Sequence, residues 1–163
     1  MKKIIYTLLI IVALTNNSFS AGSSSDNDSA AKVSDYSKAK NLIKAAKKYE
    51  KKGKNEKAQK RYVKAQKLLL KSNKKKPLQA DTLNYLGFTT RKLGDYEKGE
   101  EYYLQGLQIE PNHNGINEYL GELYMVTNRM DLAKERLNVL KSCNCKEYKQ
   151  LKEIIEGTKK SKY

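Results

Sequence analysis

A tripeptide that recurs at a fixed distance is the feature that most constrains how this chain can fold. Tyr85-Leu86-Gly87 and Tyr119-Leu120-Gly121 are 34 residues apart. A period of this length is typical of repeat architectures, in which each unit buries its apolar side against its neighbours. The mean hydropathy of -0.80 agrees with several thin layers rather than one thick core. The spacing therefore predicts an array of similar units.

The segment 80–113 contains two apolar stripes at helical spacing, separated by Gly94-Asp95. Two amphipathic helices joined by a tight turn form an antiparallel hairpin. We expect Asp95 to cap the second helix and Pro111 to prevent its continuation. The stripes consist of Leu83, Leu86, Thr90 and Leu93, and then of Tyr96, Gly99, Tyr103, Gly106 and Leu107.

This order of residues resembles the tetratricopeptide repeat. The match rests on Leu86-Gly87, Gly94-Asp95-Tyr96, Gly99 (where the family usually has Ala), Tyr103 and Pro111, and it covers roughly residues 36–157. The resemblance implies an all-α, right-handed α-solenoid of about three helical hairpins with a C-terminal capping helix. Gly87 and Gly99 are expected to allow the two helices of one hairpin to approach closely. The Cys143-Asn144-Cys145 segment before a final helix is also similar to small exported bacterial tetratricopeptide proteins.

The other units are less regular than the central one. In the third unit Asn128-Arg129 replaces Gly-Asp, and Asn tolerates the left-handed backbone that such a turn needs. In the first unit Gly53 marks the turn, 41 residues before Gly94, so about seven extra residues are expected as a longer loop at 71–77. The predicted boundaries are a signal peptide 1–20, a flexible linker 21–35, units 36–76, 80–113 and 114–147, a capping helix 148–157 and a tail 158–163.

The N-terminus has the order of a secretory signal. Lys2 and Lys3 precede an apolar run at 4–14, and small residues flank a cleavage site after Ser20. The run is too short to span a bilayer core of ~30 Å as a helix, which disfavours the alternative of an uncleaved anchor. We therefore expect a periplasmic or secreted bacterial protein, with no stable transmembrane segment after cleavage.

The positive charge is confined to one stretch of the chain. Residues 32–76 hold 18 basic and 3 acidic side chains, an excess of +15, whereas residues 77–163 hold 13 of each. Such a segregated field attracts anions. The candidate residues for a basic patch are Lys47, Lys51, Lys74, Lys75 and Lys76.

No pattern in the sequence indicates catalysis, a cofactor or a metal site. The single His113 lies in a loop between units, where a solvated turn residue is the ordinary interpretation. Phosphate-binding, serine-hydrolase and zinc-protease motifs are absent from the sequence. Cys143 and Cys145 are a candidate disulfide; a redox role and metal binding are the weaker alternatives, because neither a thioredoxin-like pattern nor two further ligands lie nearby.

The remaining expectation is binding. Tetratricopeptide hairpins are expected to line a concave groove with their first helices and to take a peptide there, so the partner is another protein or peptide. Phe88 is the most suggestive anchor, although contact with the neighbouring hairpin explains it equally well. The alternative function is an anion-binding surface for acidic envelope polymers or lipid headgroups; nucleic acid is disfavoured by export. The groove candidates are Asn84, Phe88, Arg91, Lys92, Glu118, Glu122 and Met125.

Overall fold

The computed structural model describes residues 33–161, and all regular secondary structure in this part of the chain is helical. The predicted signal peptide and most of the linker lie outside the described residues. No helix between residues 33 and 161 is long and apolar enough to cross a membrane. The elements are α1 (Asp35–Glu50), α2 (Asn55–Lys75), α3 (Ala80–Lys92), α4 (Tyr96–Ile109), α5 (Asn114–Val126), α6 (Met130–Val139), the 3₁₀ turn η1 (Leu140–Ser142) and α7 (Lys146–Ile155).

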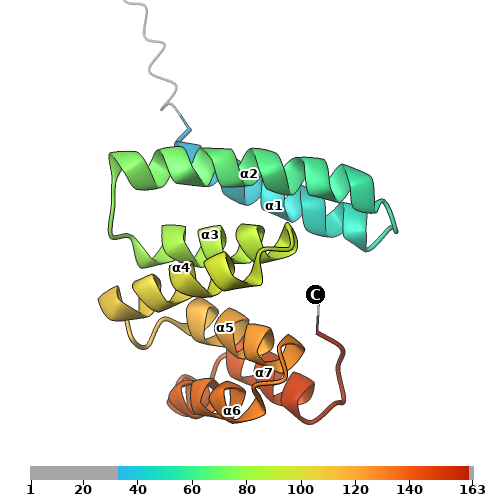
Figure 1. Ribbon diagram of the computed structural model, residues 1–163, viewed down its shortest axis with the longest axis vertical. Coiled ribbons are helices and arrows are strands. Elements are labelled where there is room, and N and C mark those ends of the chain that lie inside the picture. Colours follow the sequence, from blue (N-terminus) through green and yellow to red (C-terminus); the bar gives the residue numbers. More distant parts are fainter. Residues whose placement is uncertain (1–32, 162–163) are drawn as a thin grey trace, which may run out of the picture. The chain divides into compact units, whose positions relative to one another are not determined.

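Successive helices pack as antiparallel pairs, α1 with α2, α3 with α4 and α5 with α6 (Figure 1). Each tight turn within a pair contains one residue in the left-handed region: Gly53 (φ 66°), Gly94 (φ 99°) and Asn128 (φ 58°). Asn takes this conformation at low cost because its short side chain can bond locally. The helical hairpins and their turns are therefore confirmed, including the Asn turn of the last pair.

The central pair forms as its sequence predicts. The Asp95 side chain accepts a hydrogen bond from the Lys98 amide at 2.9 Å, which caps α4. α3 and α4 approach so closely that a Cβ built on Gly99 would lie 3.2 Å from the Gly87 carbonyl oxygen. The two small residues thus set the distance between the helices.

The predicted loop at 71–77 is wrong. α2 continues through Lys75 and is the longest helix of the described chain, so the extra residues lengthen a helix rather than a loop. Lys, which makes up most of the segment, is a good helix former, and no Gly or Pro interrupts it before Pro77. Leu69, fully buried, anchors this last part of α2 in the core.

The last helix, α7, covers the end of the array as expected of a cap. Its buried Leu151 contacts α5 where Gly121 leaves room for it, and Ile154 is buried on the same face. The repeat thus ends with an amphipathic helix whose other face is polar.

Candidate functional site

A cation lies over two aromatic rings where α1, α3 and α5 meet. The Lys47 ammonium of α1 is 4.2 Å from the ring centroid of Phe88 in α3 and 5.3 Å from that of Tyr119 in α5. It also donates a hydrogen bond to the Tyr119 hydroxyl at 3.1 Å. A cation over an aromatic face is stabilising by about 0.5–2 kcal/mol, depending on its exposure to water.

A buried ion pair lies beside this cluster. Arg91 Nη1 of α3 donates to the Tyr119 carbonyl oxygen at 2.7 Å, and Arg91 Nη2 is 3.5 Å from Glu122 Oε2 of α5. Both charged side chains are 0% exposed. We call Lys47, Phe88, Arg91, Tyr119 and Glu122 the first-helix face, because all five belong to the first helix of a pair.

Most of the predicted groove residues are more deeply buried than the sequence suggests. The first helix α3 lies between the first helices α1 and α5, and α5 lies between α3 and α7, so positions off one apolar stripe are covered by a neighbouring element. Phe88 shows this most clearly: its ring centroid is 5.8 Å from that of Tyr62 and 5.1 Å from that of Tyr119. Asn84, Phe88, Arg91, Glu118 and Glu122 are all at most 6% exposed, whereas Lys92 and Met125 are partly exposed.

The structure therefore shows the second interpretation of Phe88, in which its ring contacts the neighbouring hairpin. A part in ligand binding stays a prediction for all seven groove candidates. Tyr119 was missed, although it stands in the same repeat position as Tyr85, 34 residues earlier. The sequence signal that could have identified it is an aromatic residue beside the apolar stripe in two successive units.

Lys92 belongs to a second polar cluster, between the first two pairs. Its ammonium is 2.6 Å from Glu50 Oε1, and the Tyr62 hydroxyl donates to Glu50 Oε2 at 2.9 Å. The Gln59 side chain also donates to the Lys92 carbonyl oxygen at 3.0 Å. Burial, followed by the neighbouring Glu50 carboxylate, raises the pKa of Tyr62. These bonds attach α3 to the lysine-rich pair α1–α2.

The basic-patch candidates do not form one patch. Lys47 and Lys51 are at the end of α1, whereas Lys74, Lys75 and Lys76 are at the end of α2. Because the two helices are antiparallel, the two groups lie at opposite ends of the pair. Lys75 is 2.9 Å from Asp35, at the start of α1, and the hydrogen bond from Lys75 lowers the pKa of the Asp35 carboxyl.

A cleft of about 330 Å³ lies at this Asp35 end, between the start of α1, the end of α2 and the start of α3. Its charged lining is mixed: Asp35 and Asp81 stand against Lys75 and Lys76. The Lys75–Asp35 ion pair lies in this cleft, so part of its charge is paired. Residues 33–161 contain no group of three or more acidic, His or Cys side chains placed to hold a metal.

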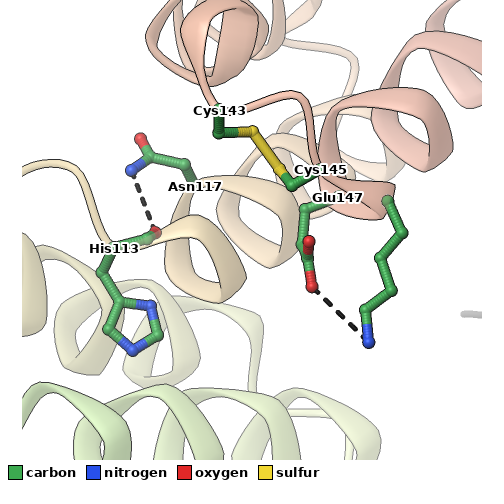
Figure 2. The surroundings of a disulfide bond; sticks show 6 residues. His113, Asn117, Cys143, Cys145 and Glu147 are labelled. Carbon is green, nitrogen blue, oxygen red and sulfur yellow. Dashed lines mark hydrogen bonds and ion pairs between the residues drawn. A yellow bond between two sulfur atoms is a disulfide. The ribbon is translucent and has the colours of Figure 1, made fainter.

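Cys143 and Cys145 are joined by a disulfide, with Cα atoms 5.2 Å apart (Figure 2). The intervening Asn144 is left-handed (φ 45°), and Cys145 directly precedes α7. The bridge thus closes the turn that leads from η1 into the capping helix.

His113 has a structural task that the sequence did not indicate. Its Nδ1 accepts a hydrogen bond from the Ile116 amide at 3.1 Å and so caps α5. The other ring nitrogen, Nε2, lies 3.3 Å from Asp81 Oδ1 of α3. The His113 carbonyl oxygen also accepts from Asn117 (Figure 2). The contacts of the His113 imidazole thus cap α5 and connect it to α3.

Comparison with known proteins identifies the fold. No protein-family model matches the chain. The chain is similar to the Sol locus transcriptional repressor of Clostridium acetobutylicum, with 39% identity over 72 residues. That match covers 42% of this chain and 23% of the repressor, so the chain matches under a quarter of the length of this curated relative.

A solved structure extends the comparison over most of the chain. It is described as the first TPR of Spaghetti (RPAP3) bound to the HSP90 peptide SRMEEVD, and it aligns with a TM-score of 0.53 and 18% identity. The alignment covers 77% of this chain and 95% of that chain. At this identity the likeness concerns the fold alone. The chain therefore has a helical-repeat fold of tetratricopeptide type.

Proposed function

We propose that this protein is an exported, non-enzymatic scaffold that binds a peptide segment of another protein on the first-helix face. The observation that carries the proposal is the likeness in fold, over 77% of the chain, to a tetratricopeptide domain that was solved with a peptide bound. Scaffolds of stacked helical pairs present extended surfaces to their partners, and such surfaces are their usual binding sites.

The accessible part of the first-helix face consists of Lys47 and Tyr119. Aromatic side chains are among the groups that most often dominate binding energies at interfaces. Here Lys47 and Tyr119 are partly exposed above the buried Phe88 and Arg91, so the accessible groups stand on a packed layer. Groups that packing already holds in place lose less conformational freedom on binding.

Selection from a library of displayed random peptides tests this proposal. The full mature chain is immobilised, and enriched peptides are then measured against Lys47→Ala and, as the matched control, Lys60→Ala. Lys60 is exposed on α2, away from the first-helix face. We expect binding to weaken at least about tenfold in Lys47→Ala and to be unchanged in Lys60→Ala. Failure to enrich any peptide, or equal losses in both variants, would contradict the proposal.

Export is tested separately. Residues 1–20 fused to a phosphatase that is active only outside the bacterial cytoplasm should give activity, and the mature chain should begin at Ala21. An inactive fusion would remove the exported role and leave the peptide-binding proposal standing.

The excess of lysine favours a second candidate function, the binding of anionic envelope polymers or lipid headgroups. Most lysines of α1 and α2 are exposed, but they are spread over both ends of the pair. Binding to vesicles containing phosphatidylglycerol should then collapse between 50 and 500 mM salt, since exposed charges are screened over about 10 Å at 0.1 M and about 3 Å at 1 M. Binding that persists at high salt would exclude this electrostatic function.

A further inference from the structure

A hollow with a basic lining lies where the end of α1 meets the start of α2. Its volume is about 300 Å³. Its walls consist of Tyr49, Lys57, Lys60, Arg61 and Lys64. Four of these five side chains are cations and none is acidic, whereas the cleft at the Asp35 end has a mixed lining. A concave site lined by charges of one sign concentrates ions of the opposite sign, so this hollow attracts anions.

The lysines of the hollow are available to a ligand. Lys57, Lys60 and Lys64 are all exposed. Lys57 and Lys64 form no ion pair with any residue of the described range 33–161. Lys60 pairs with Glu56, but both side chains are more than two-thirds exposed, and an ion pair so open to water is weak. A bound anion therefore meets three ammonium groups without breaking a buried contact.

Arg61 adds donors whose geometry suits phosphate. Its guanidinium lies 5.9 Å from the Tyr49 ring centroid, which places both side chains at one wall of the hollow. The guanidinium N–H groups form a planar fork that matches two oxygens of a phosphate group. One arginine among three lysines is thus suited to a phosphate monoester or diester.

A stripe of α2 continues from the hollow along the helix. Its members follow one another at spacings of three and four residues, which places them on one helical face. They alternate between lysine and aliphatic residues: Lys60, Val63, Lys67, Leu70 and Lys74. All five are exposed, Val63 by 39% and Leu70 by 45%. Residues 57–75 contain eight basic and no acidic side chains, so nothing on this stripe repels an anionic surface.

The two apolar residues indicate which anionic partner fits. A polyanionic chain interacts with the lysines only, and Val63 and Leu70 contribute nothing to that contact. A membrane surface takes both kinds of side chain, because phosphate groups lie directly above the acyl region. Lysine stems can cover apolar surface while their ammonium groups reach the phosphates. The alternation therefore favours a lipid surface over an acidic polymer.

We propose that the hollow and the adjoining stripe of α2 bind the surface of a membrane that contains anionic phospholipids, with one headgroup phosphate held in the hollow. This inference rests on the second candidate function, the binding of anions by the lysine-rich pair, and gives it a site and one class of ligand. No residue of this site belongs to the first-helix face, so the two surfaces can be tested independently.

The first experiment removes charge from the hollow. The full mature chain is titrated with vesicles of equal parts phosphatidylglycerol and phosphatidylcholine, and the double variant Lys57→Gln with Lys64→Gln is compared with it. The matched control is Lys141→Gln with Lys149→Gln, which removes the same charge from two exposed positions of the C-terminal part. A lysine near an anionic leaflet contributes roughly fivefold in affinity, so binding should weaken at least about tenfold in the hollow variant and less than about twofold in the control.

The second experiment separates lipid from polymer. Val63→Ser with Leu70→Ser keeps every charge, and both positions are exposed, so the fold should persist; circular dichroism checks this for each variant. We expect vesicle binding to weaken at least about threefold, because apolar contact with the interface is lost, and binding to polyphosphate to be unchanged. Vesicle binding that is unchanged in this variant would overturn the lipid assignment and point to an acidic polymer.

The outcomes also separate this site from the functions proposed above. Equal losses in the two lysine double variants would overturn the site and leave the second candidate function standing, since net charge alone would then explain the binding. Absence of vesicle and polyphosphate binding at low salt would remove both. Neither result affects peptide binding on the first-helix face, which the displayed library measures separately.

Discussion

The Tyr103 ring occupies the space that any side chain at position 87 would need: a Cβ built on Gly87 lies 2.5 Å from Tyr103 Cε1. Tyr103 is fully buried between α3, α4 and α5 and cannot move aside without displacing its neighbours. Real Cβ atoms do not approach carbon atoms so closely, so the aromatic ring of α4 and the glycine of α3 depend on each other.

Gly87→Ala should therefore destabilise the protein by about 1–3 kcal/mol, despite the better helix propensity of Ala. Gly121→Ala is the matched control, because its added Cβ would meet Leu151 Cδ2 at the same 2.5 Å. A leucine methyl can change rotamer more easily than a buried ring can shift, so the loss at Gly121 should be smaller. Urea unfolding of the two variants measures the difference, and equal losses would show that Tyr103 is not the obstacle.

Removal of the Tyr103 hydroxyl should be harmless or stabilising. This oxygen is buried and has no hydrogen-bond partner among residues 33–161. An unsatisfied buried hydroxyl costs about 1–3 kcal/mol, so Tyr103→Phe should leave the free energy of unfolding unchanged or raise it by about 1 kcal/mol. A clear decrease in the urea midpoint would indicate that the hydroxyl has a partner after all.

The same substitution should flatten the alkaline limb of the stability profile. Burial raises the pKa of Tyr103. The positive charge of Arg91 opposes this rise only in part. A tyrosine whose folded pKa lies above its unfolded value of about 10 contributes stability below pH 10, and this contribution is lost as the pH rises further. Unfolding followed from pH 8 to 11 should show a smaller loss for Tyr103→Phe than for the natural chain.

Arg129 joins the second helical pair to the third. Its guanidinium donates to both carboxylate oxygens of Glu100 at 3.0 and 2.6 Å, and its Nε donates to Thr127 at 2.9 Å. Lysine cannot reproduce this two-pronged geometry, so Arg129→Lys should cost about 1 kcal/mol. Lys60→Ala, which removes an exposed pair with Glu56, should cost about 0.5 kcal/mol or less. Thermal unfolding would contradict the assignment if the two losses were equal.

Acid should remove one contact between α1 and α2. The hydrogen bond from Lys75 is the largest cause of the lowered Asp35 pKa. Burial opposes it in part, and the charge of Lys71 adds to the lowering. A carboxyl with a lowered folded pKa stabilises the protein above about pH 4, and this stabilisation is lost as the pH falls through the folded value. Asp35→Asn should therefore be less stable than the natural chain at pH 7, and the difference should vanish at pH 2. Lys75→Ala should reduce the same pH dependence, since it removes the largest cause.

The sequence by itself determined the helical hairpins. A 34-residue period, two stripes at helical spacing, and Gly or Asn between them are local properties. The caps, turns and helix ends they specify depend on contacts within a few residues, which is why Asp95, Gly94 and Asn128 behave as predicted. The long α2 was missed because helix propensity is only a weak guide and does not decide whether the seven extra residues before Pro77 continue a helix or form a loop.

Only the tertiary structure decided which side chains share the first-helix face. Phe88 and Tyr119 are 31 residues apart, and Glu122 and Ser161 are 39 apart, so no local pattern brings them together. Residues predicted to line an open groove are buried because α3 is covered by α1 and α5, and α5 by α3 and α7. The angle between stacked helices sets that coverage, and it depends on side-chain packing between pairs rather than on the periodicity within any one helix.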